Sequence, residues 1–533
     1  MTQQNDTATD EAISRSSAMM TGIVLVSRLT GFVRTWAQAF ALGATMLASC
    51  YTVANNLPNL LFEITIAGML YTAFLPVYMS VKKKSGIKGA SDYTSNMASI
   101  IILLMGVLTV IAFIFASPLV FTQSAGANSE TFSFETAEVF LRFFCIEVLF
   151  YPLSALLTSV LNAERKFFWG QAAPIFNNLI VIASFLLGAL FLQENYMLAF
   201  TIIAIGNPLG VAVQLFVQMP AMRKAGIRFK FRIDWKDPSL RDTVRIGVPS
   251  LLVTICAAVL ASVQSSCSLV EHHSGAAILY YVRVWFVLPA SLLSVPVSTA
   301  TFTELSDLYA QKKLPDFRIR AIKGLQQILF FMIPFTFYLI AFSQFLMALL
   351  GSSSFDEYAL STSISTLAVM STALIFYALA PYLQNVFAAM HRLGFYSASY
   401  AIATIVACLG CAISVNYIGI LGAALSYTLF YCLIVVAALI RLRAKLGSLG
   451  MKEVLKQAFI MTALGILGAL GGWGASFVIL YICDVQTLTF GYSLVCLVIG
   501  GIASLVITYG LAYIFKVPAA RTMFGALLGR FGR

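Results

Sequence analysis

Long apolar runs, separated by short polar connections, recur along the chain from residue 17 to residue 515. A helix needs about 20 apolar residues to cross the hydrocarbon core of a bilayer, and most of these runs reach that length. We therefore predict an all-α membrane protein with about 14 transmembrane helices. The predicted spans are residues 17–42, 47–81, 92–121, 134–162, 169–193, 196–221, 243–269, 276–306, 321–349, 359–389, 395–415, 419–440, 454–483 and 488–515.

The connections between these spans carry Lys and Arg in strict alternation. Short cytoplasmic loops retain positive charge, whereas translocated loops do not, so both termini are expected in the cytoplasm. The basic connections are 82–91, 163–168, 222–242, 307–320, 390–394, 441–453 and the C-terminal tail. The connections without Lys or Arg are 43–46, 122–133, 194–195, 270–275, 350–358, 416–418 and 484–487.

An internal repeat indicates two similar halves. Residues 150–153 (FYPL) are echoed at 376–379 (FYAL), and Leu57-Pro58 is echoed by Leu288-Pro289. These matches pair span 2 with span 8 and span 4 with span 10, so spans 1–6 and 7–12 are expected to form two pseudo-symmetric six-helix lobes. Transporters built from such repeats hold their substrate between the halves.

The predicted organisation has six parts. They are a cytoplasmic tail (1–16), an N-lobe (17–221), a basic cytoplasmic linker (222–242), a C-lobe (243–445), two additional spans (446–516) and a basic cytoplasmic tail (517–533).

The first span contains two arginines, Arg28 and Arg34. A charge inside hydrocarbon costs about 2.5–3.5 kcal/mol even on the mildest insertion scale, so each arginine must face a cavity or a partner. Six residues apart on a helix, they point about 120° from each other and could line two walls of one cavity. The alternative is that one or both reach the cytoplasmic surface or form a structural pair.

Polar residues form stripes along spans 2 and 8, at helical spacings of three and four. A polar stripe does not face lipid, so both spans are expected to line a hydrated central cavity. The alternative is hydrogen bonding between helices in a dry bundle. The substrate-binding candidates are Arg28, Arg34, Arg283, Asn56, Asn59, Glu63, Ser49, Thr52, Ser291, Ser298 and Glu304.

Composition and motifs narrow the function. With 60% hydrophobic and 11% charged residues, the chain cannot be a water-soluble domain. The net charge of +12 follows from topology here and does not indicate a nucleic-acid partner. The sequence contains no HExxH motif and no Walker A loop, so we expect neither an enzyme nor a bound metal or cofactor.

Three segments near the N-terminus resemble a known family. They are residues 27–34 (SRLTGFVR), residues 54–61 (ANNLPNLL), and Gly68 followed by residues 73–77 (AFLPV). They are similar to the opening of MurJ/MviN flippases of the multidrug/oligosaccharidyl-lipid/polysaccharide exporter superfamily, most closely the actinobacterial branch.

This resemblance implies a bacterial plasma-membrane transporter that moves lipid II to the outer leaflet by alternating access. The driving force would be the membrane potential or an ion gradient, and cell-wall synthesis or division proteins are further candidate partners. In the family, two first-span arginines face the pyrophosphate, and these correspond to Arg28 and Arg34. The two extra helices would flank a groove for the polyprenyl tail.

The sequence departs from the family at several positions. Ser49 stands where an aspartate is usual and Phe62 where many members have arginine, while Arg283 lies one residue before the expected arginine, at Val284. The acidic motif expected near residues 392–397 is absent. A flippase for another polyprenyl-linked glycan, such as an O-antigen or teichoic-type precursor, therefore stays open. So do a non-transporting cell-wall scaffold and, third among the transporters, a drug antiporter.

Overall fold

The computed structural model describes residues 2–67, 74–351, 353–448 and 450–520. Gly68 and Ala73 of the family-like segments, and most of the predicted tail at 517–533, lie outside these residues. The chain divides into two compact units, Met1–Ser124 with Phe132–Ala258 and Ala125–Thr131 with Val259–Arg533. The division falls within helix α11 (Pro238–Ser268), beyond the linker predicted at 222–242.

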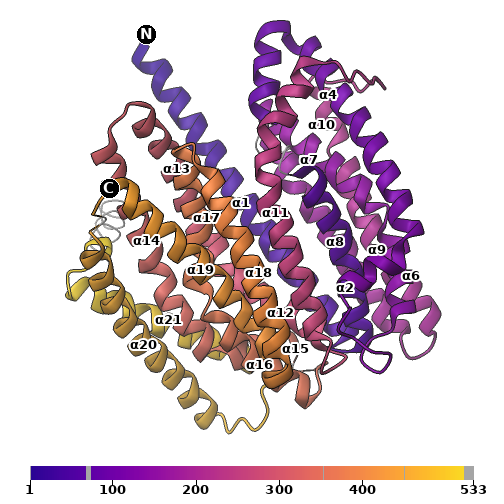
Figure 1. Ribbon diagram of the computed structural model, residues 1–533. Helices are drawn as coiled ribbons and strands as arrows, with labels where there is room; N and C mark the ends of the chain where they lie inside the picture. The colour runs from indigo at the N-terminus through magenta and orange to yellow at the C-terminus, as the bar shows by residue number, and fades with distance from the viewer. Residues whose placement is uncertain (1, 68–73, 352, 449, 521–533) are drawn as a thin grey trace. The chain divides into compact units, whose positions relative to one another are not determined.

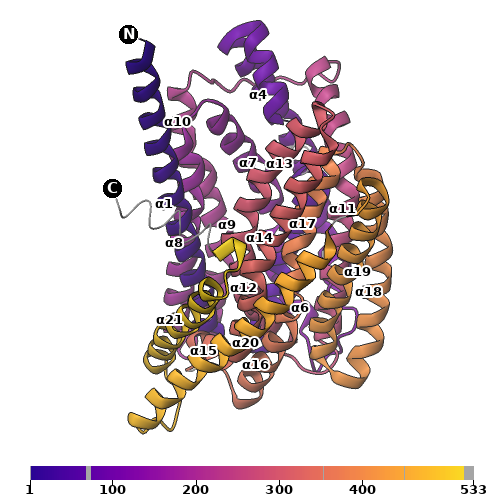
Figure 2. The ribbon, with the colours of Figure 1, turned by 90° about the vertical axis from the view of Figure 1, so that its left-hand side faces the viewer.

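The first unit consists of helices joined by short connections (Figures 1 and 2). Helices α8 and α9 lie side by side, and α1 packs along α8. The elements are α1 (Thr2–Leu42), α2 (Met46–Phe62), the π-helical turn η1 (Glu63–Ala67), α4 (Phe74–Ile114), α5 (Ala116–Thr122), α6 (Phe134–Phe144), α7 (Glu147–Ala163), α8 (Phe167–Phe191), α9 (Tyr196–Phe216), α10 (Met219–Lys224) and the first part of α11.

The second unit repeats this pattern and adds two helices. The added pair, α20 (Met451–Ile482) and α21 (Phe490–Ile514), packs together, and α20 also contacts α14. The remaining elements are α12 (Gly275–Pro289), the π-helical turn η2 (Ala290–Ser294), α13 (Val295–Ala310), α14 (Leu314–Ala341), α15 (Ser343–Gly351), α16 (Glu357–Ser371), α17 (Leu374–Ala389), α18 (Leu393–Ile418) and α19 (Ile420–Leu446).

Helix α4 is a hairpin rather than one straight rod. Gly86 has φ 65° and ψ −164°, a backbone conformation that suits glycine because it has no Cβ. The ring of Phe74 stacks on that of Tyr93, with centroids 5.4 Å apart, so the chain reverses between them. The basic connection predicted at 82–91 is therefore helical on both sides of a single turning residue.

Membrane-spanning helices dominate the described chain. Ten are long and apolar enough to cross a bilayer, and the bent pairs α6–α7 and α16–α17 raise the count to 12. The first predicted span falls on α1, and the second, 47–81, runs from α2 and η1 to the start of α4; the count does not include α1 or α2. The all-α membrane fold predicted from the sequence is confirmed.

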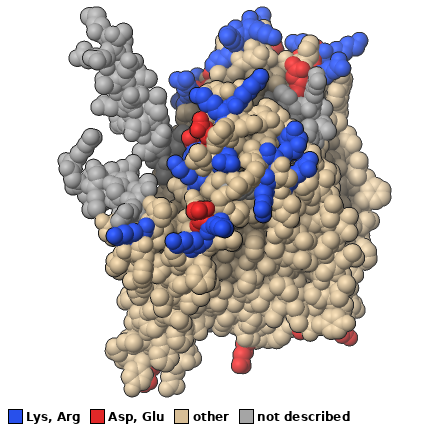
Figure 3. All heavy atoms as spheres, turned by 60° about the vertical axis from the view of Figure 1, so that its left-hand side comes forward, with Lys and Arg blue, Asp and Glu red and all other residues tan. Residues whose placement is uncertain are grey.

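The helix surfaces fit a hydrocarbon solvent. On α21, Val498, Ile502 and Val506 are 51%, 58% and 66% exposed and lie one turn apart. An apolar stripe of this kind would aggregate in water, whereas lipid solvates it. In the face drawn in Figure 3, Lys and Arg gather over the upper part, and the lower part is almost free of charge.

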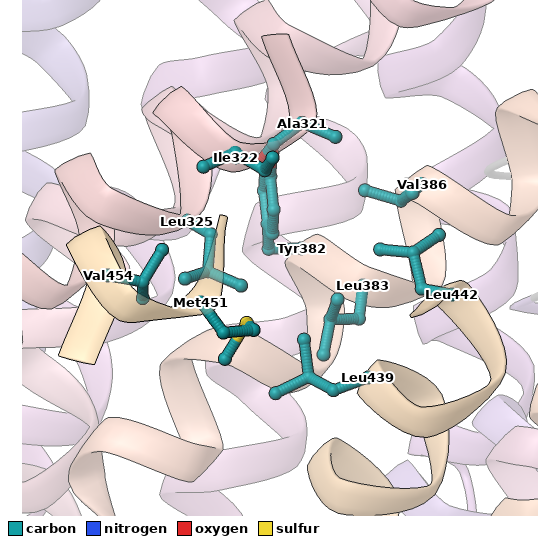
Figure 4. A pocket seen from close by; sticks show the side chains of 10 residues that line it. All are labelled: Ala321, Ile322, Leu325, Tyr382, Leu383, Val386, Leu439, Leu442, Met451 and Val454. Carbon is teal, nitrogen blue, oxygen red and sulfur yellow. The ribbon is translucent and has the colours of Figure 1, made fainter. Parts of the chain in front are cut away.

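A small gap between helices of the second unit is lined by apolar side chains (Figure 4). Its volume of about 10 Å³ holds at most one water molecule. The Tyr382 hydroxyl at its edge donates to the Ala321 carbonyl at 2.5 Å. We interpret the gap as a packing defect, because it is too small for a ligand.

Candidate functional site

Arg34 of α1 lies in a polar network that joins four helices of the first unit. Its Nη2 donates to Oδ1 of Asn207 on α9 at 3.0 Å. The Nδ2 of Asn207 donates to Oε1 of Glu147 on α7 at 2.9 Å and to Oδ1 of Asn55 on α2. Asn207 therefore bridges a guanidinium and a carboxylate through the two ends of one amide.

Burial strengthens this network. Glu147 and Asn207 are fully buried, and Asn55 is 9% exposed. Glu147 interacts electrostatically with Arg34, and Tyr151, one turn further along α7, contacts the same carboxylate. Because an unpaired ion deep in a protein costs several kcal/mol, the two opposite charges stabilise each other. The arrangement holds the Arg34 guanidinium in a defined position.

Small residues bring the supporting helices together. Gly206, next to Asn207, packs where a Cβ would overlap the side chain of Ser184 on α8. Asn178 of α8 donates to the Thr30 hydroxyl at 3.0 Å and so ties α8 to α1. Close packing and interhelical hydrogen bonds are the main sources of association when lipid is the solvent.

The same two helices, α7 and α9, carry a second polar cluster. Gln214 of α9 and Gln218, two residues after the end of α9, donate to the Ser154 hydroxyl at 3.1 and 2.8 Å, and Thr158 donates to Gln218 at 2.9 Å. Asn177 of α8 donates to Gln214 at 2.9 Å. The two clusters form a polar seam along the α7–α9 contact.

Sequence reasoning did not identify this seam, although a signal was present. Glu147, Tyr151, Ser154 and Thr158 recur at spacings of four, three and four, the pattern that singled out spans 2 and 8. Partners on α9 could not be assigned without the packing of the helices.

Arg283 of α12 has a different environment, in the second unit. Its Nη2 donates to the Tyr427 hydroxyl, and its guanidinium carbon lies 5.2 Å from the Tyr427 ring centroid. Around it, Phe286 contacts Tyr377 and Tyr427, with centroids 5.0 and 5.9 Å apart. An aromatic face attracts a guanidinium through its quadrupole, so this cation is held by rings.

The predicted stripe on α2 lies beside the Arg34 network. Ser49 is fully buried, Thr52 accepts a hydrogen bond from Gln38 of α1 at 3.4 Å, and Asn56 donates to Gln123 at 3.1 Å. Asn59 donates to the Asn55 carbonyl at 3.3 Å, and Glu63 is exposed at the start of η1. Asn55, which the stripe did not include, bonds Asn207 directly, and Asn59 of the stripe reaches the network through a side-chain hydrogen bond with Tyr151.

The predicted stripe of span 8 runs from η2 into α13. Ser291 donates to the Leu288 carbonyl at 2.9 Å, and Ser298 accepts from Asn385 of α17 at 3.0 Å. Glu304, at the far end, pairs with Arg320 of α14. These contacts distribute the candidates over several helix pairs and do not gather them at Arg283.

Arg28, two turns before Arg34 on α1, is exposed and lies outside the Arg34 network. Each of the three predicted cations therefore has its own setting: exposed for Arg28, a carboxylate–amide network for Arg34 and an aromatic cage for Arg283. Among the described residues, no group of three or more His, Cys, Asp or Glu could hold a metal ion.

The second unit also contains an apolar pocket of about 200 Å³. Trp285 and Pro289 of α12, Phe335 of α14, and Leu497 and Leu505 of α21 contribute to its lining. It lies where the additional helix α21 meets the repeated helices and has the chemistry to hold a hydrocarbon chain.

These features define a class: a polytopic membrane transporter with the fold of multidrug and lipid exporters. A solved structure titled lipid II flippase MurJ, in an inward closed conformation, superposes with a TM-score of 0.72 at 19% identity, over 93% of this chain and 99% of the other. An inward-facing multidrug resistance MATE family transporter of the MOP superfamily gives a TM-score of 0.66 at 14% identity, over 81% and 98%.

The particular family follows from the sequence comparisons. The lipid II flippase MurJ family matches residues 38–511, and the chain belongs to that family. A probable lipid II flippase MurJ of Buchnera aphidicola is 24% identical over 374 residues, 70% of this chain and 72% of the relative. The lipid II flippase MurJ of Burkholderia cenocepacia is 27% identical over 301 residues, 55% of this chain and 57% of the relative.

Proposed function

We propose that this protein moves lipid II, an undecaprenyl-diphosphate-linked peptidoglycan precursor, from the inner to the outer leaflet by alternating access. Its membership of the lipid II flippase MurJ family carries the proposal. MATE transporters with a similar fold have inward-facing and outward-facing conformations, as alternating access requires. The protein would act in the bacterial plasma membrane with both termini in the cytoplasm.

In this proposal, arginines bind the diphosphate. A guanidinium stays charged when desolvated, and its planar fork matches phosphate oxygens. Arg34, fixed by Asn207 and Glu147, would be the principal contact, with Arg28 and Arg283 as further cations. The polyprenyl tail would occupy the apolar pocket beside α21.

The energy source would be the membrane potential or an ion gradient, with no cofactor and no covalent chemistry. The remaining polar candidates on α2, η2 and α13 would hydrate the route of the headgroup. Cell-wall synthesis or division proteins are proposed as further partners.

Binding of lipid II by purified variants tests the proposal. Arg28→Ala and Arg34→Ala should each weaken binding of lipid II and of undecaprenyl diphosphate by at least tenfold, because each loses a charge-assisted contact. Lysine should restore only part of the affinity. Arg283→Ala should have a smaller effect, since Arg283 lies one residue before the position where the family has its arginine.

The matched control is Arg142→Ala, because Arg142 forms an exposed pair with Glu138 on its own helix. It should bind lipid II normally. Cells carrying only the Arg28/Arg34 double variant should accumulate lipid II in the inner leaflet. Unchanged binding and growth with that variant would instead support the scaffold alternative.

A further inference from the structure

The predicted basic linker follows a fixed path along helix α4, within the first unit. Residues 227–234 are non-helical, and their backbone is hydrogen-bonded to side chains of α4. The N–H groups of Arg228, Lys230 and Arg232 donate to the hydroxyl oxygens of Ser91, Ser95 and Ser99 at 3.0, 3.2 and 3.0 Å. We call residues 227–234 the linker strap.

The spacing of this ladder matches two regular geometries. Two residues of extended chain advance about 6.6 Å, and four residues of α-helix advance about 6.0 Å. Serines at every fourth position can therefore bond every second residue of the strap. Asn96 closes the ladder, accepting from the Asp234 N–H at 2.7 Å and donating to its carbonyl at 3.0 Å.

The ladder also fixes the side chains of the strap. Its sequence alternates, with Ile227, Phe229, Phe231 and Ile233 separated by Arg228, Lys230 and Arg232. In an extended chain, alternate side chains point to opposite faces, so the strap has one apolar and one basic face. Ile227 is buried, whereas Phe229 and Phe231 are 56% and 67% exposed.

The strap lies level with the polar-to-apolar boundary of α4. Lys88 precedes the ladder serines, and the continuous apolar stretch of the helix, 100–114, follows them. If α4 spans the membrane, this boundary is where the headgroup layer begins. Aromatic and basic side chains are the types that settle in this layer.

Charge identifies the ligand. Residues 223–241 include seven Lys or Arg and two Asp. Both acids are engaged, Asp234 with Arg232 at 3.3 Å and Asp237 with Asn96 at 3.3 Å. The segment therefore presents a net positive surface beside two exposed aromatic rings.

We propose that the linker strap is a binding site for anionic phospholipid headgroups of the cytoplasmic leaflet. Phe229 and Phe231 enter the boundary between headgroups and acyl chains, and Arg228 and Lys230 contact the lipid phosphate. The location in the cytoplasmic leaflet rests on the orientation given under Proposed function, whereas binding itself does not.

The test uses the purified full-length protein and compares the affinity for phosphatidylglycerol with that for phosphatidylcholine, by native mass spectrometry. Arg228→Gln/Lys230→Gln should lower the phosphatidylglycerol affinity by roughly tenfold or more, since each cation near an anionic surface contributes about fivefold. Phosphatidylcholine affinity should not change. These side chains take no part in the ladder, which uses backbone N–H groups, so folding is preserved.

Arg443→Gln/Lys445→Gln is the matched control, with two exposed cations at the end of α19. It should bind phosphatidylglycerol like the wild type. Ser91→Ala/Ser95→Ala, which releases the strap and keeps its charges, should give an intermediate loss. Equal losses of phosphatidylglycerol affinity in the strap and control variants would overturn the proposal. Unchanged phosphatidylglycerol affinity in the strap variant would also overturn it, and a cellular defect in that variant would then point to a protein partner of the strap.

Lipid II binding is measured in the same samples. Normal lipid II binding together with unchanged phosphatidylglycerol binding in the strap variant rejects the strap proposal alone. Failure of the proposed flippase function would instead appear as lipid II affinity that is unchanged in the Arg28→Ala and Arg34→Ala variants.

Discussion

In the first unit, helices α6 and α7 are bent by 40°, and in the second unit α16 and α17 are bent by 45°. Pro58 precedes the π-helical turn η1, and Pro289 immediately precedes η2. The helices α7 and α17 are followed by residues with positive φ, Arg165 at 57° and His391 at 54°. The two units thus share backbone features at corresponding points of the internal repeat.

The polar chemistry at corresponding points differs. Glu147 of the first unit aligns with Ala373 of the second by the offset that relates residues 150–153 to 376–379, and Asn55 aligns with Phe286 by the offset of the proline pair. One unit therefore holds its arginine with a carboxylate and amides, and the other with aromatic rings. Backbone shape has been retained in the repeat, while the means of holding a cation has diverged.

The largest effect is expected at Glu147. Glu147→Ala leaves the Arg34 charge without its buried counter-charge, which should cost about 3–5 kcal/mol of stability and abolish lipid II binding. Glu147→Gln keeps an oxygen for the Asn207 amide and should recover much of the stability. Thermal unfolding in detergent and lipid II binding measure the two effects.

The second unit supplies the reverse experiment. Ala373 is fully buried, so Ala373→Glu places a carboxylate where no Asn207 equivalent is expected and should destabilise the protein. Glu138→Ala, which removes an exposed helical pair, should change stability by less than about 1 kcal/mol. Wild-type stability in Glu147→Ala would show that Arg34 does not depend on the carboxylate.

An intermediate effect is expected in the packing of the paired helices. A Cβ at Gly206 of α9 would overlap Ser184 of α8, whereas a Cβ at Gly410 of α18 meets only the Leu429 methyl at 3.0 Å. Gly206→Ala should therefore cost about 1–3 kcal/mol and Gly410→Ala little. Both changes gain the same helix propensity, so the difference in melting temperature reports packing alone.

Ser184→Gly provides the control for this comparison. It removes the side chain that the new methyl group would meet, so it should restore most of the stability lost in Gly206→Ala. Equal melting temperatures for Gly206→Ala and Gly410→Ala would mean that the two helix pairs are equally adaptable.

The sequence predicts backbone features better than polar contacts, for a physical reason. Span length, charge alternation and the echo of Pro58 by Pro289 are local properties, so the spans and the repeat could be predicted. The partner of Arg34 could not, because Asn207 is far away in sequence and meets it only through the packing of α9. The serine ladder of α4 has a clear four-residue spacing, but the sequence does not show what those serines bond.

Arg34 and Arg283 illustrate the same limit. Each could be predicted to need a partner, since a bare charge does not persist in hydrocarbon. The kind of partner depends on neighbouring helices and differs between the units. The sequence pattern can indicate a partner only when that partner is close in sequence, as the Asn55 carbonyl is for Asn59.

The smallest effect on stability is expected for one ion pair in each unit, Lys82–Glu164 in the first and Arg320–Glu304 in the second. Glu164, which follows α7 and has a side chain 10% exposed, accepts from the Tyr78 hydroxyl at 2.7 Å and from Lys82 at 2.7 Å. Glu304 in α13 has a side chain 53% exposed and pairs with Arg320. Solvent and salt screen the second pair more strongly.

Glu164→Gln should therefore lower stability by about 1 kcal/mol, and Glu304→Gln by less than half of that. Melting temperatures at low and high salt measure both, and salt should reduce the Glu304 effect towards zero while leaving most of the Glu164 effect. Lys82→Met serves as the control, because it removes one donor and keeps the tyrosine bond, and it should fall between the two. A larger loss of stability in Glu304→Gln than in Glu164→Gln would mean that residues besides Arg320 contribute to the exposed pair. Burial would then not decide how much each glutamate stabilises its unit.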